Sequence, residues 1–597
     1  MDVDSFLAHY GLMQNPFDAE EARHDSVFAQ SMDSSPGHPQ FGKIFGQLDP
    51  PSTSVVFGEK GSGKTAIRLM IAHRIKSENQ RHPDQQTMLV VYDDLNPMLD
   101  AVCHQHRRGK SADVDAILQD LRLEDHQDAI LSIAVTKLVD IACEKEHADE
   151  AMVTLNRPDQ RIRKMPRRLR VAAALLAVLY DQQQGEDVTG RWIKLRRKLR
   201  CGGIRRYSLL RIAALVTTIL AAGLLITYFL TRHAPMEPLP VVTAVSRQPT
   251  LLAQTTTNGD IKDLMDPALI PEETEPASPA VVPPRNIPKA DPVTPVKADE
   301  NIAPQPVITV RQEPTTPADI SPTMVLALGG TMLAATVVLW LLWLQGQFIL
   351  WRLCRKTCRA MPTIKRTPSQ LRQFFAELPR QELVRHVLSI AGTEGRNSRY
   401  QLTHLLIQIL GELGFTGVIV VVDRVDEPTL VTGMPQRMRS LIWPMLNNKF
   451  LQQDGMGFKM LLPIELSHIL HRESPQFFQE ARLDKQRVID PLTWSGATLY
   501  DLCTSRLRIC MDPQCEHTIS LTDIFETDVT RQILVDALDQ MRQPRDAFKF
   551  LYHVIQEHCR MIPQDQACHK IARPTLEMIR RTQSQRVDDL FRGLAPA

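Results

Sequence analysis

Eight residues near the start of the chain have the types and the spacing of a loop that binds phosphate. The pattern G-x-x-x-x-G-K-[ST] is matched at every position by Gly58, Glu59, Lys60, Gly61, Ser62, Gly63, Lys64 and Thr65. Glycines allow the backbone to wrap around phosphates, whose negative charge is stabilised by the amino terminus of a following helix. Lys64 is expected to reach the β- and γ-phosphates, and the Thr65 hydroxyl to ligate Mg²⁺. We therefore predict a nucleotide-binding loop that extends from Gly58 to Ala66.

The residues on either side of this loop have the patterns that such a loop requires. SVVF, residues 54–57, is a short β-branched run typical of a buried strand, and residues 66–78 have apolar side chains at helical spacing. A chance match in a glycine-containing turn is the alternative. A strand before the loop and a helix after it favour the phosphate-binding interpretation.

Two aliphatic runs end in acids that could complete such a site. The first, residues 88–96, contains Asp93 and Asp94, and the second, VIVVVDRVDE, contains Asp423. The second is favoured because five consecutive aliphatic residues are typical of a strand that is covered on both faces. We expect the first strand to lie further out in the sheet, with Asp93 and Asp94 near the site edge or capping the segment that follows.

The acids of the second run have distinct expected roles. Ligands gather at the carboxyl edge of a parallel sheet, so Asp423 is expected on a strand beside the loop-bearing strand, where it would hold Mg²⁺ through water. Glu427 or Asp426 is expected to orient or deprotonate an attacking water, with Lys64 stabilising the transferred phosphate. A solvated acid at a strand end is the alternative for Asp423.

Two segments have the length and composition of membrane helices. Residues 212–230 form a run of 19 without a charge, and residues 324–344 form a run of 21. Each spans roughly 30 Å as a helix, which matches the hydrocarbon thickness of a bilayer. A third apolar run, residues 171–180, is too short to span and is predicted to be a buried cytosolic helix.

The charges that flank these segments predict their orientation. Residues 191–211 contain nine Lys or Arg and no acid, and residues 352–366 contain six and no acid. Residues 232–322 contain 7 basic and 12 acidic residues. The positive-inside rule therefore predicts both termini in the cytoplasm and the intervening loop outside. That loop has 18 prolines and no aromatic residue, so we expect it to be disordered.

These features together resemble the KAP P-loop NTPases, in which membrane helices interrupt the nucleotide domain, and which are related to the STAND and AAA+ ATPases. The resemblance implies an α/β fold with an ASCE-type parallel sheet covered by helices on both faces, interrupted by a two-helix transmembrane hairpin. It implies ATP and Mg²⁺ as ligands, homo-oligomers, and a location in the bacterial inner membrane. The nearly balanced charge, 70 basic and 68 acidic residues, gives no support for a nucleic-acid partner.

The expected layout assigns each part of the chain to a structural role. It comprises residues 1–165 and 401–515 as the two halves of the NTPase domain, 166–211 as a basic cytosolic helical segment, 212–230 and 324–344 as transmembrane helices, 231–323 as the external loop, 345–400 as a juxtamembrane helical segment, and 516–597 as a lid-like helical subdomain.

Two further stretches resemble ExeA-type secretion ATPases and Orc/Cdc6-like AAA+ proteins. Residues 10–28, YGLMQNPFDAEEARHDSVF, are similar to an opening segment that packs near the adenine in those proteins. QPRDAFKF, residues 543–550, resembles a helix start in their small helical domain, which implies that Arg545 senses the state of the nucleotide. The choice between ATP and GTP and the protein partner stay open.

The chain also departs from the pattern of these families. The residue after Asp423, usually acidic, is Arg424, so Glu427 or Asp426 is expected to substitute, or hydrolysis to be slow. At the usual place of a polar sensor the chain offers Glu465. Candidate fingers that would reach a neighbouring subunit are Arg482, Arg506 and Arg508. A membrane ATPase in signalling or defence is the favoured function. A nucleotide-binding scaffold with little hydrolysis, or an ExeA-like envelope assembly ATPase, is the alternative.

Overall fold

The computed structural model describes two compact units of the chain. One comprises Met1–Val216 with Thr336–Ala597, and the other comprises Thr217–Ala335. The described residues are 1–19, 21–32, 37–107, 113–143, 155, 158–182, 188–201, 206–233, 322–361, 366–379, 383, 387, 395–515, 517–563 and 568–591. The external loop, residues 231–323, is predicted to be disordered, but its ends, residues 231–233 and 322–323, are helical. The rest of this loop, residues 234–321, lies outside the described residues.

A five-stranded parallel sheet forms the centre of the larger unit, in the order β2-β3-β4-β1-β5. Its strands are β1 (Ser54–Gly58), β2 (Gln86–Tyr92), β3 (Phe415–Val422), β4 (Met456–Pro463) and β5 (Arg487–Ile489). All the residues of β1 and β4 are buried, as are seven of the eight residues of β3. The parallel α/β sheet expected from these aliphatic runs is therefore confirmed. It joins two strands that precede the two long apolar helices in the sequence to three strands that follow them.

The order of the strands corrects one expectation. β3 does not lie beside the loop-bearing strand β1, because β4 pairs with both of them. β4 is less aliphatic than β3 and contains Lys459, but it is buried along its whole length, as a central strand requires. β2 lies at the edge of the sheet, as expected.

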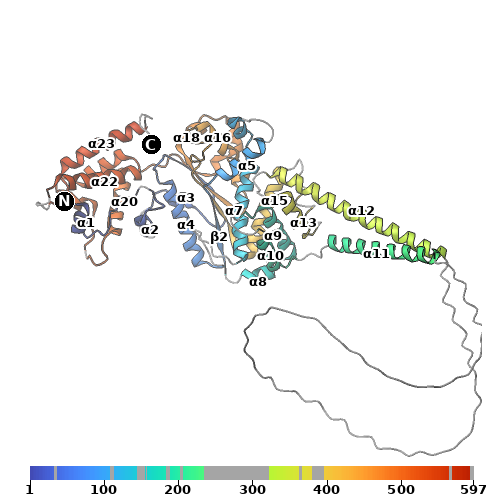
Figure 1. Cartoon of the computed structure of the whole chain (residues 1–597). Helices are drawn as coiled ribbons and strands as arrows, with labels where there is room; N and C mark the ends of the chain where they lie inside the picture. The colour runs from blue at the N-terminus through green and yellow to red at the C-terminus, as the bar shows by residue number, and fades with distance from the viewer. Residues whose placement is uncertain are drawn as a thin grey trace, which may run out of the picture. The chain divides into compact units, whose positions relative to one another are not determined.

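Helices cover both faces of the sheet, as expected. On one face, Val56, Ile419 and Leu461 share a core with α4 (Lys64–Arg81) and with α3 (Phe41–Phe45). On the other face, alternate strand residues share a core with three further helices (Figure 1). These are α7 (Leu123–Cys143), α9 (Arg167–Tyr180) and α15 (Gly395–Leu413). Residues 171–180 all lie in α9 and all are buried, which confirms the predicted buried helix.

A second core is formed by helices from the two ends of the chain. α1 (Val3–His9) packs with α20 (Gly496–Ile509), α21 (Arg531–Met541), α22 (Pro544–Met561) and α23 (Arg573–Phe591) (Figure 1). α20 lies within the range 401–515 that we assigned to the sheet domain, yet its buried side chains belong to this helical core. The other helices in this unit are α2 (Ser26–Ser31), α5 (Asn96–Arg107), α6 (Val114–Gln119), α8 (Pro158–Lys164), α10 (Val188–Leu199), α13 (Pro368–Phe375), α16 (Pro435–Ile442), α17 (Asn448–Leu451), α18 (Ile464–Leu470) and α19 (Pro475–Ala481).

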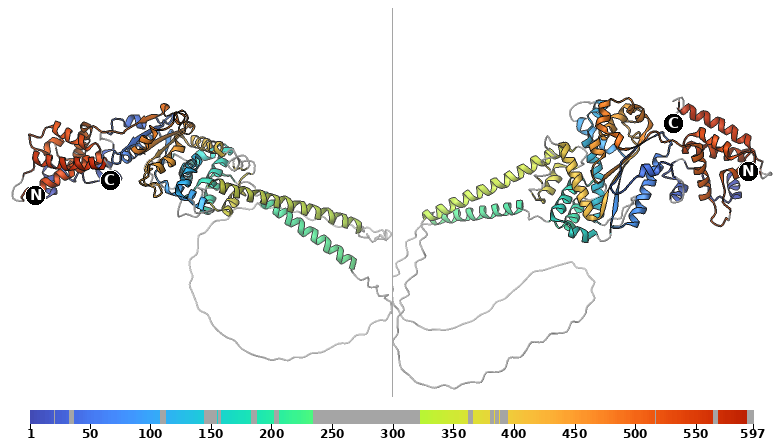
Figure 2. Two further views of the ribbon diagram at one scale, coloured as in Figure 1. Left: turned by 90° about the horizontal axis from the view of Figure 1, so that it is seen from above. Right: turned by 180° about the vertical axis from the view of Figure 1, so that it is seen from behind.

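Two helices are long and apolar enough to cross a membrane. They are α11 (Arg206–His233) and α12 (Pro322–Ala360), with candidate spans at Leu209–Leu230 and Met324–Ala360. Figures 1 and 2 show each of them as one long, continuous helix. Only 11% of each apolar window is buried, so large apolar side chains such as Ile219 face outward, as lipid contact would require. Their orientation stays a prediction from the charge pattern.

Candidate functional site

A cavity of about 630 Å³ lies at the carboxyl edge of the sheet. Its wall is made by the loop after β1, by residues 423–427 after β3 (the β3 turn), by N-terminal residues that include Ala19, Arg23, Phe28 and His38, and by the start of α22. This volume is within the range of small-molecule sites, and the carboxyl edge of a parallel sheet is where ligands bind.

The loop between β1 and α4 has the conformation that its glycines permit. Gly61 and Gly63 have φ angles of 96° and 93°, in the left-handed region that side chains disfavour. The Lys64 ammonium group donates hydrogen bonds to the carbonyl oxygens of Gly58 (2.8 Å) and Glu59 (2.9 Å). Burial lowers the pKa of Lys64, and the negative charges of nearby acids, Asp426 first, oppose that shift. Lys64 is thus held across the loop in an acidic surrounding.

Three other parts of the chain hold this loop in place. The Trp494 indole donates a hydrogen bond to the carbonyl oxygen of Ser62 at 2.9 Å. Gln543, just before α22, donates a hydrogen bond to the carboxylate of Glu59, whose pKa is raised by burial. A Cβ atom on Gly61 would lie only 3.2 Å from Cβ of Arg545, so the loop and the start of α22 are in close contact.

The β3 turn brings a buried carboxylate to the same cavity. Asp423 is 1% exposed, and its backbone N–H donates to the carbonyl oxygen of Tyr92 at the end of β2 (3.3 Å). Its Oδ2 accepts no hydrogen bond from the described part of the chain and lies 3.8 Å from Nε of Arg68. Burial raises the pKa of Asp423, against the Arg424 backbone N–H and the charges of Arg68 and Lys64.

The next residues of the β3 turn differ from what a water-activating site requires. Arg424 has a φ of 59°, unusual for a residue with a side chain, and its guanidinium lies 3.1 Å from the Glu427 carboxylate. The Glu427 side chain is 54% exposed, and burial nevertheless raises its pKa against the positive charge of Arg424. Asp426 also lines the cavity, and of the acids around Lys64 its charge has the largest effect on the Lys64 pKa.

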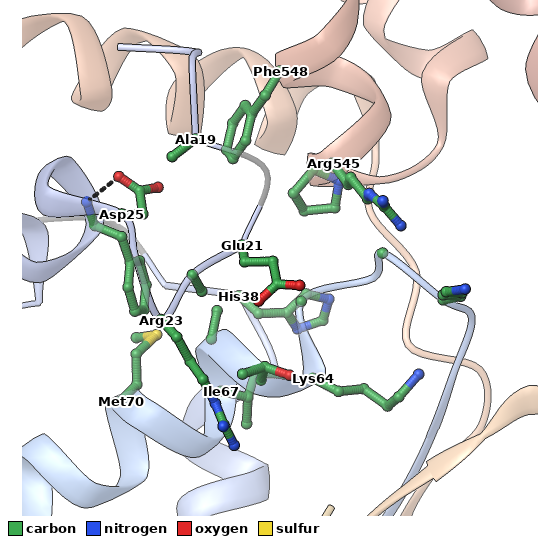
Figure 3. Close-up of a pocket in the computed structure, with 18 of the residues that line it drawn as sticks. Ala19, Glu21, Arg23, Asp25, His38, Lys64, Ile67, Met70, Arg545 and Phe548 are labelled. Atoms are coloured by element: carbon green, nitrogen blue, oxygen red, sulfur yellow. Dashed lines mark hydrogen bonds between the residues drawn. The ribbon is translucent and has the colours of Figure 1, made fainter. Parts of the chain in front are cut away.

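The N-terminal residues before α3 form another part of the cavity wall, and they are held there by contacts with α20. Arg506 of α20 donates to the carbonyl oxygen of Pro16 (2.7 Å), pairs with Asp25 (2.7 Å) and lies over the ring of Phe548 at 4.5 Å. Figure 3 shows Phe548 and Ala19 near each other at one end of the cavity, away from Lys64. One end of the cavity therefore has an aromatic ring beside an ion pair that is satisfied within the chain, and the other end has Lys64 and its neighbouring acids.

The structure brings most of the predicted site residues together. The cavity is lined by Lys60, Gly61, Gly63, Lys64, Thr65, Ala66, Asp423, Asp426, Glu427 and Arg545. The other three residues of the motif support the loop. Gly58 accepts a hydrogen bond from Lys64, Glu59 accepts one from Gln543, and Ser62 accepts one from Trp494. Residues 10–28 contribute to the wall through Ala19 and its neighbours up to Phe28.

Other predicted residues lie elsewhere or have another role. Arg506 is 3% exposed and forms an ion pair with Asp25. It therefore connects two parts of this chain and is not a finger that reaches a neighbouring subunit. Arg482 pairs with Asp484, Arg508 donates to the carbonyl oxygen of Ile519, and Glu465 is exposed on the first turn of α18. None of these three lines the cavity.

Asp93 and Asp94, which follow β2, were expected either near the site edge or as caps of the next segment, and each of them has one of these roles. Asp94 accepts a hydrogen bond from the backbone N–H of Asn96, where α5 begins (3.1 Å), which is a capping contact. Asp93 lies at the site edge, where it pairs with Arg68 and Arg23.

Three contributors were not predicted: Arg68, Trp494 and Gln543. Arg68 has a sequence signal, because it follows Lys64 by four residues and therefore lies on the same face of α4. Trp494 and Gln543 reach the loop from more than 400 positions away. Gln543 opens the QPRDAFKF stretch that resembles a helix start near the nucleotide, whereas nothing in the local pattern around Trp494 indicates its contact.

The oxygen atoms at this edge fit a magnesium ion. Mg²⁺ is commonly bound by one or two carboxylates together with substrate phosphates. Asp423 provides a buried carboxylate oxygen without a hydrogen bond among the described residues, and Thr65 provides a hydroxyl in the same cavity. Among the described residues, no group of three or more His, Cys, Asp or Glu forms a metal site by itself.

Comparisons with known proteins do not assign this chain to a family. A scan against protein-family models, a search of curated proteins and a search of solved structures all found no match. The chemistry of the site must therefore be judged from its own geometry.

Proposed function

We propose that this chain is a membrane-anchored P-loop NTPase that binds Mg-ATP in the cavity at the carboxyl edge of its sheet. One observation carries the proposal: a complete phosphate-loop motif, with its lysine half-buried, lies in one cavity with Asp423 from a strand more than 350 residues further along. A chance match to the motif is not expected to share a cavity with a buried carboxylate that has an oxygen without a hydrogen-bond partner among the described residues.

The residues of the cavity divide the binding of a nucleotide among themselves. The backbone N–H groups of the loop and the start of α4 would bind the phosphates, and Lys64 would exchange its two carbonyl acceptors for phosphate oxygens. Arg545 would add a second cation from α22. The end near Phe548, whose aromatic ring offers a stacking surface, would take the base. Thr65 and Asp423 would hold Mg²⁺, which when bound neutralises phosphate charge.

Hydrolysis requires a group that orients or deprotonates water, and two acids are available. Asp426 and Glu427 both line the cavity. Nucleotide turnover at the cytoplasmic face would then drive a conformational change in signalling or defence, with homo-oligomers as the expected assembly. An ExeA-like role in envelope assembly would place the function in the loop outside the membrane.

A second candidate function has a specific observation in its favour. Arg424 occupies the position after Asp423 and pairs with Glu427, which neutralises one of the two acids that could act on water. A nucleotide-binding scaffold that hydrolyses slowly, and acts through its nucleotide-bound form, is consistent with this arrangement.

The proposal is tested by ATP binding to the full chain in detergent, using two lysines of α4. Lys64→Ala removes the half-buried lysine of the loop, and Lys76→Ala removes an exposed lysine of the same helix that does not line the cavity, as the matched control. We expect Lys64→Ala to weaken ATP binding about tenfold to a hundredfold, and Lys76→Ala to change it little. Equal affinities in all three proteins would contradict the proposal.

Turnover in the same preparation separates the two candidate functions. An ATPase should hydrolyse ATP, and Glu427→Gln or Asp426→Asn should bind ATP without cleaving it. If the wild-type protein binds ATP through Lys64 but shows no turnover, the scaffold is the correct function.

A further inference from the structure

A chain of ion pairs crosses the carboxyl edge of the sheet, and its centre is Arg68. The Arg68 guanidinium lies 3.2 Å from Oδ2 of Asp93 through Nη1 and 3.8 Å from Oδ2 of Asp423 through Nε. Asp93 in turn lies 2.6 Å from Nη2 of Arg23. The two carboxylates follow β2 and β3, which are adjacent strands, so one guanidinium can reach both.

Arg68 is buried, which requires an explanation. It is 3% exposed, and an arginine removed from water is costly unless acids compensate its charge. It lies one turn after Lys64 on α4, which directs both cations toward the end of the sheet where Asp423 lies. A leucine or methionine would fill this helix position without that cost, so the charge itself is the feature to explain.

The contact between Arg68 and Asp423 is electrostatic without being a hydrogen bond. At 3.8 Å the atoms are beyond hydrogen-bond distance, and Asp423 Oδ2 accepts no hydrogen bond from any described residue. The carboxylate therefore has its charge partly compensated while the lone pairs of one oxygen stay available. Those lone pairs are what a divalent cation, or water bound to it, would use.

We propose that Arg68 is a positioning residue that competes with the divalent cation for the Asp423 carboxylate, so that metal binds weakly here until phosphates contribute further ligands. Arg68 keeps Asp93 as a partner when Asp423 turns to the metal, so its own charge stays compensated. This inference deepens the proposed function and rests on it for the presence of phosphate, whereas the competition itself concerns only Arg68, Asp423 and the metal.

The experiment measures binding of Mn²⁺ to the full chain in detergent, without nucleotide, from the electron paramagnetic resonance signal of free Mn²⁺. We expect Arg68→Gln to raise the affinity for Mn²⁺ about tenfold or more, because an opposing charge close to the carboxylate is removed. Arg68→Lys keeps the charge but shortens its reach, so it should raise the affinity by a smaller factor. Adding Asp423→Asn to Arg68→Gln should abolish the gain.

Arg23→Gln is the matched control, since Arg23 also pairs with Asp93 and has no ion pair with Asp423 among the described residues. We expect it to change the affinity for Mn²⁺ less than about twofold. An equal rise in Arg23→Gln and Arg68→Gln would overturn the proposal, because it would show a general effect of charge. Unchanged affinity in both Arg68→Gln and Arg68→Lys would also overturn it. If Arg68→Gln does not fold, Arg68→Lys alone decides.

The result is independent of nucleotide binding. Loss of the Lys64 effect on ATP with the Mn²⁺ result intact would reject the proposed function and leave a metal site controlled by Arg68. The opposite pair of results would leave the nucleotide site and reject the role of Arg68.

Discussion

The phosphate loop and the β3 turn face the same cavity but differ in how their polar groups are held. In the loop, Lys64 has two carbonyl acceptors, Ser62 accepts from Trp494, and Glu59 accepts from Gln543. In the β3 turn, one oxygen of Asp423 accepts no hydrogen bond from the described residues, and Arg424 has a left-handed backbone.

This difference bears on the proposed function. Apart from the buried Ser62 hydroxyl, which has no hydrogen-bond partner among the described residues, the polar groups of the loop named above are paired, so the phosphate binding that we propose would require little ordering of the loop. The β3 turn has an available carboxylate oxygen beside competing cations, so its arrangement should depend on what is bound. We therefore expect changes in the loop and in its contacts to affect affinity, and changes in the β3 turn to affect metal dependence and turnover.

Arg545 gives the largest expected effect among the contacts around the loop. Arg545→Ala should weaken ATP binding roughly tenfold or more in an equilibrium binding assay, because a charge-assisted contact to phosphate is lost. Arg542→Ala removes an arginine three residues earlier, whose pair with Asp588 is exposed, and should leave the affinity nearly unchanged. Equal effects of the two substitutions would remove Arg545 from the site.

Arg424 gives the next largest effect, on turnover. Aspartate and asparagine both tolerate the left-handed backbone at this position, so Arg424→Asp and Arg424→Asn differ chiefly in one negative charge. If the missing acid limits hydrolysis, Arg424→Asp should turn over ATP about tenfold faster than Arg424→Asn. Phosphate release in single- and multiple-turnover assays measures this, and equal rates would show that the residue after Asp423 does not limit the reaction.

Trp494 gives the smallest effect. Trp494→Phe keeps an aromatic ring against His38 but removes the hydrogen bond to Ser62, which should weaken ATP binding about threefold. Trp443→Phe is a suitable control, since the Trp443 indole donates to Glu473, and neither Trp443 nor Glu473 lines the cavity. A large loss of affinity in Trp494→Phe, or the same loss in Trp443→Phe, would contradict a merely supporting role.

The sequence predicts the parts of this site that depend on local patterns. The loop is recognisable because its glycines, lysine and threonine occur at fixed spacing, and β3 because it is a continuous aliphatic run. The position of β4 between β1 and β3 could not be predicted, since the local pattern of a buried strand does not specify its order in a parallel sheet.

The contacts that hold the site were harder to predict than the site itself. The sequence offers Arg506 as one of three candidate fingers, with a surface salt bridge as the alternative, whereas in the structure it is buried against Asp25 and Phe548. Its environment depends on residues from the opposite end of the chain, which no local pattern specifies. Arg68 is the exception, because its spacing from Lys64 alone places it near the acids.

The central claim is that the loop and Asp423 form one site although the membrane segments separate them in the sequence. The most direct test is the dependence of ATP affinity on Mg²⁺ in the wild-type protein, in Asp423→Asn and in Asp94→Asn, an exposed acid that caps α5. We predict that Mg²⁺ strengthens ATP binding in the wild type and in Asp94→Asn, and that Asp423→Asn loses this enhancement while still binding ATP. An undiminished Mg²⁺ effect in Asp423→Asn would contradict the claim that the two halves share one site.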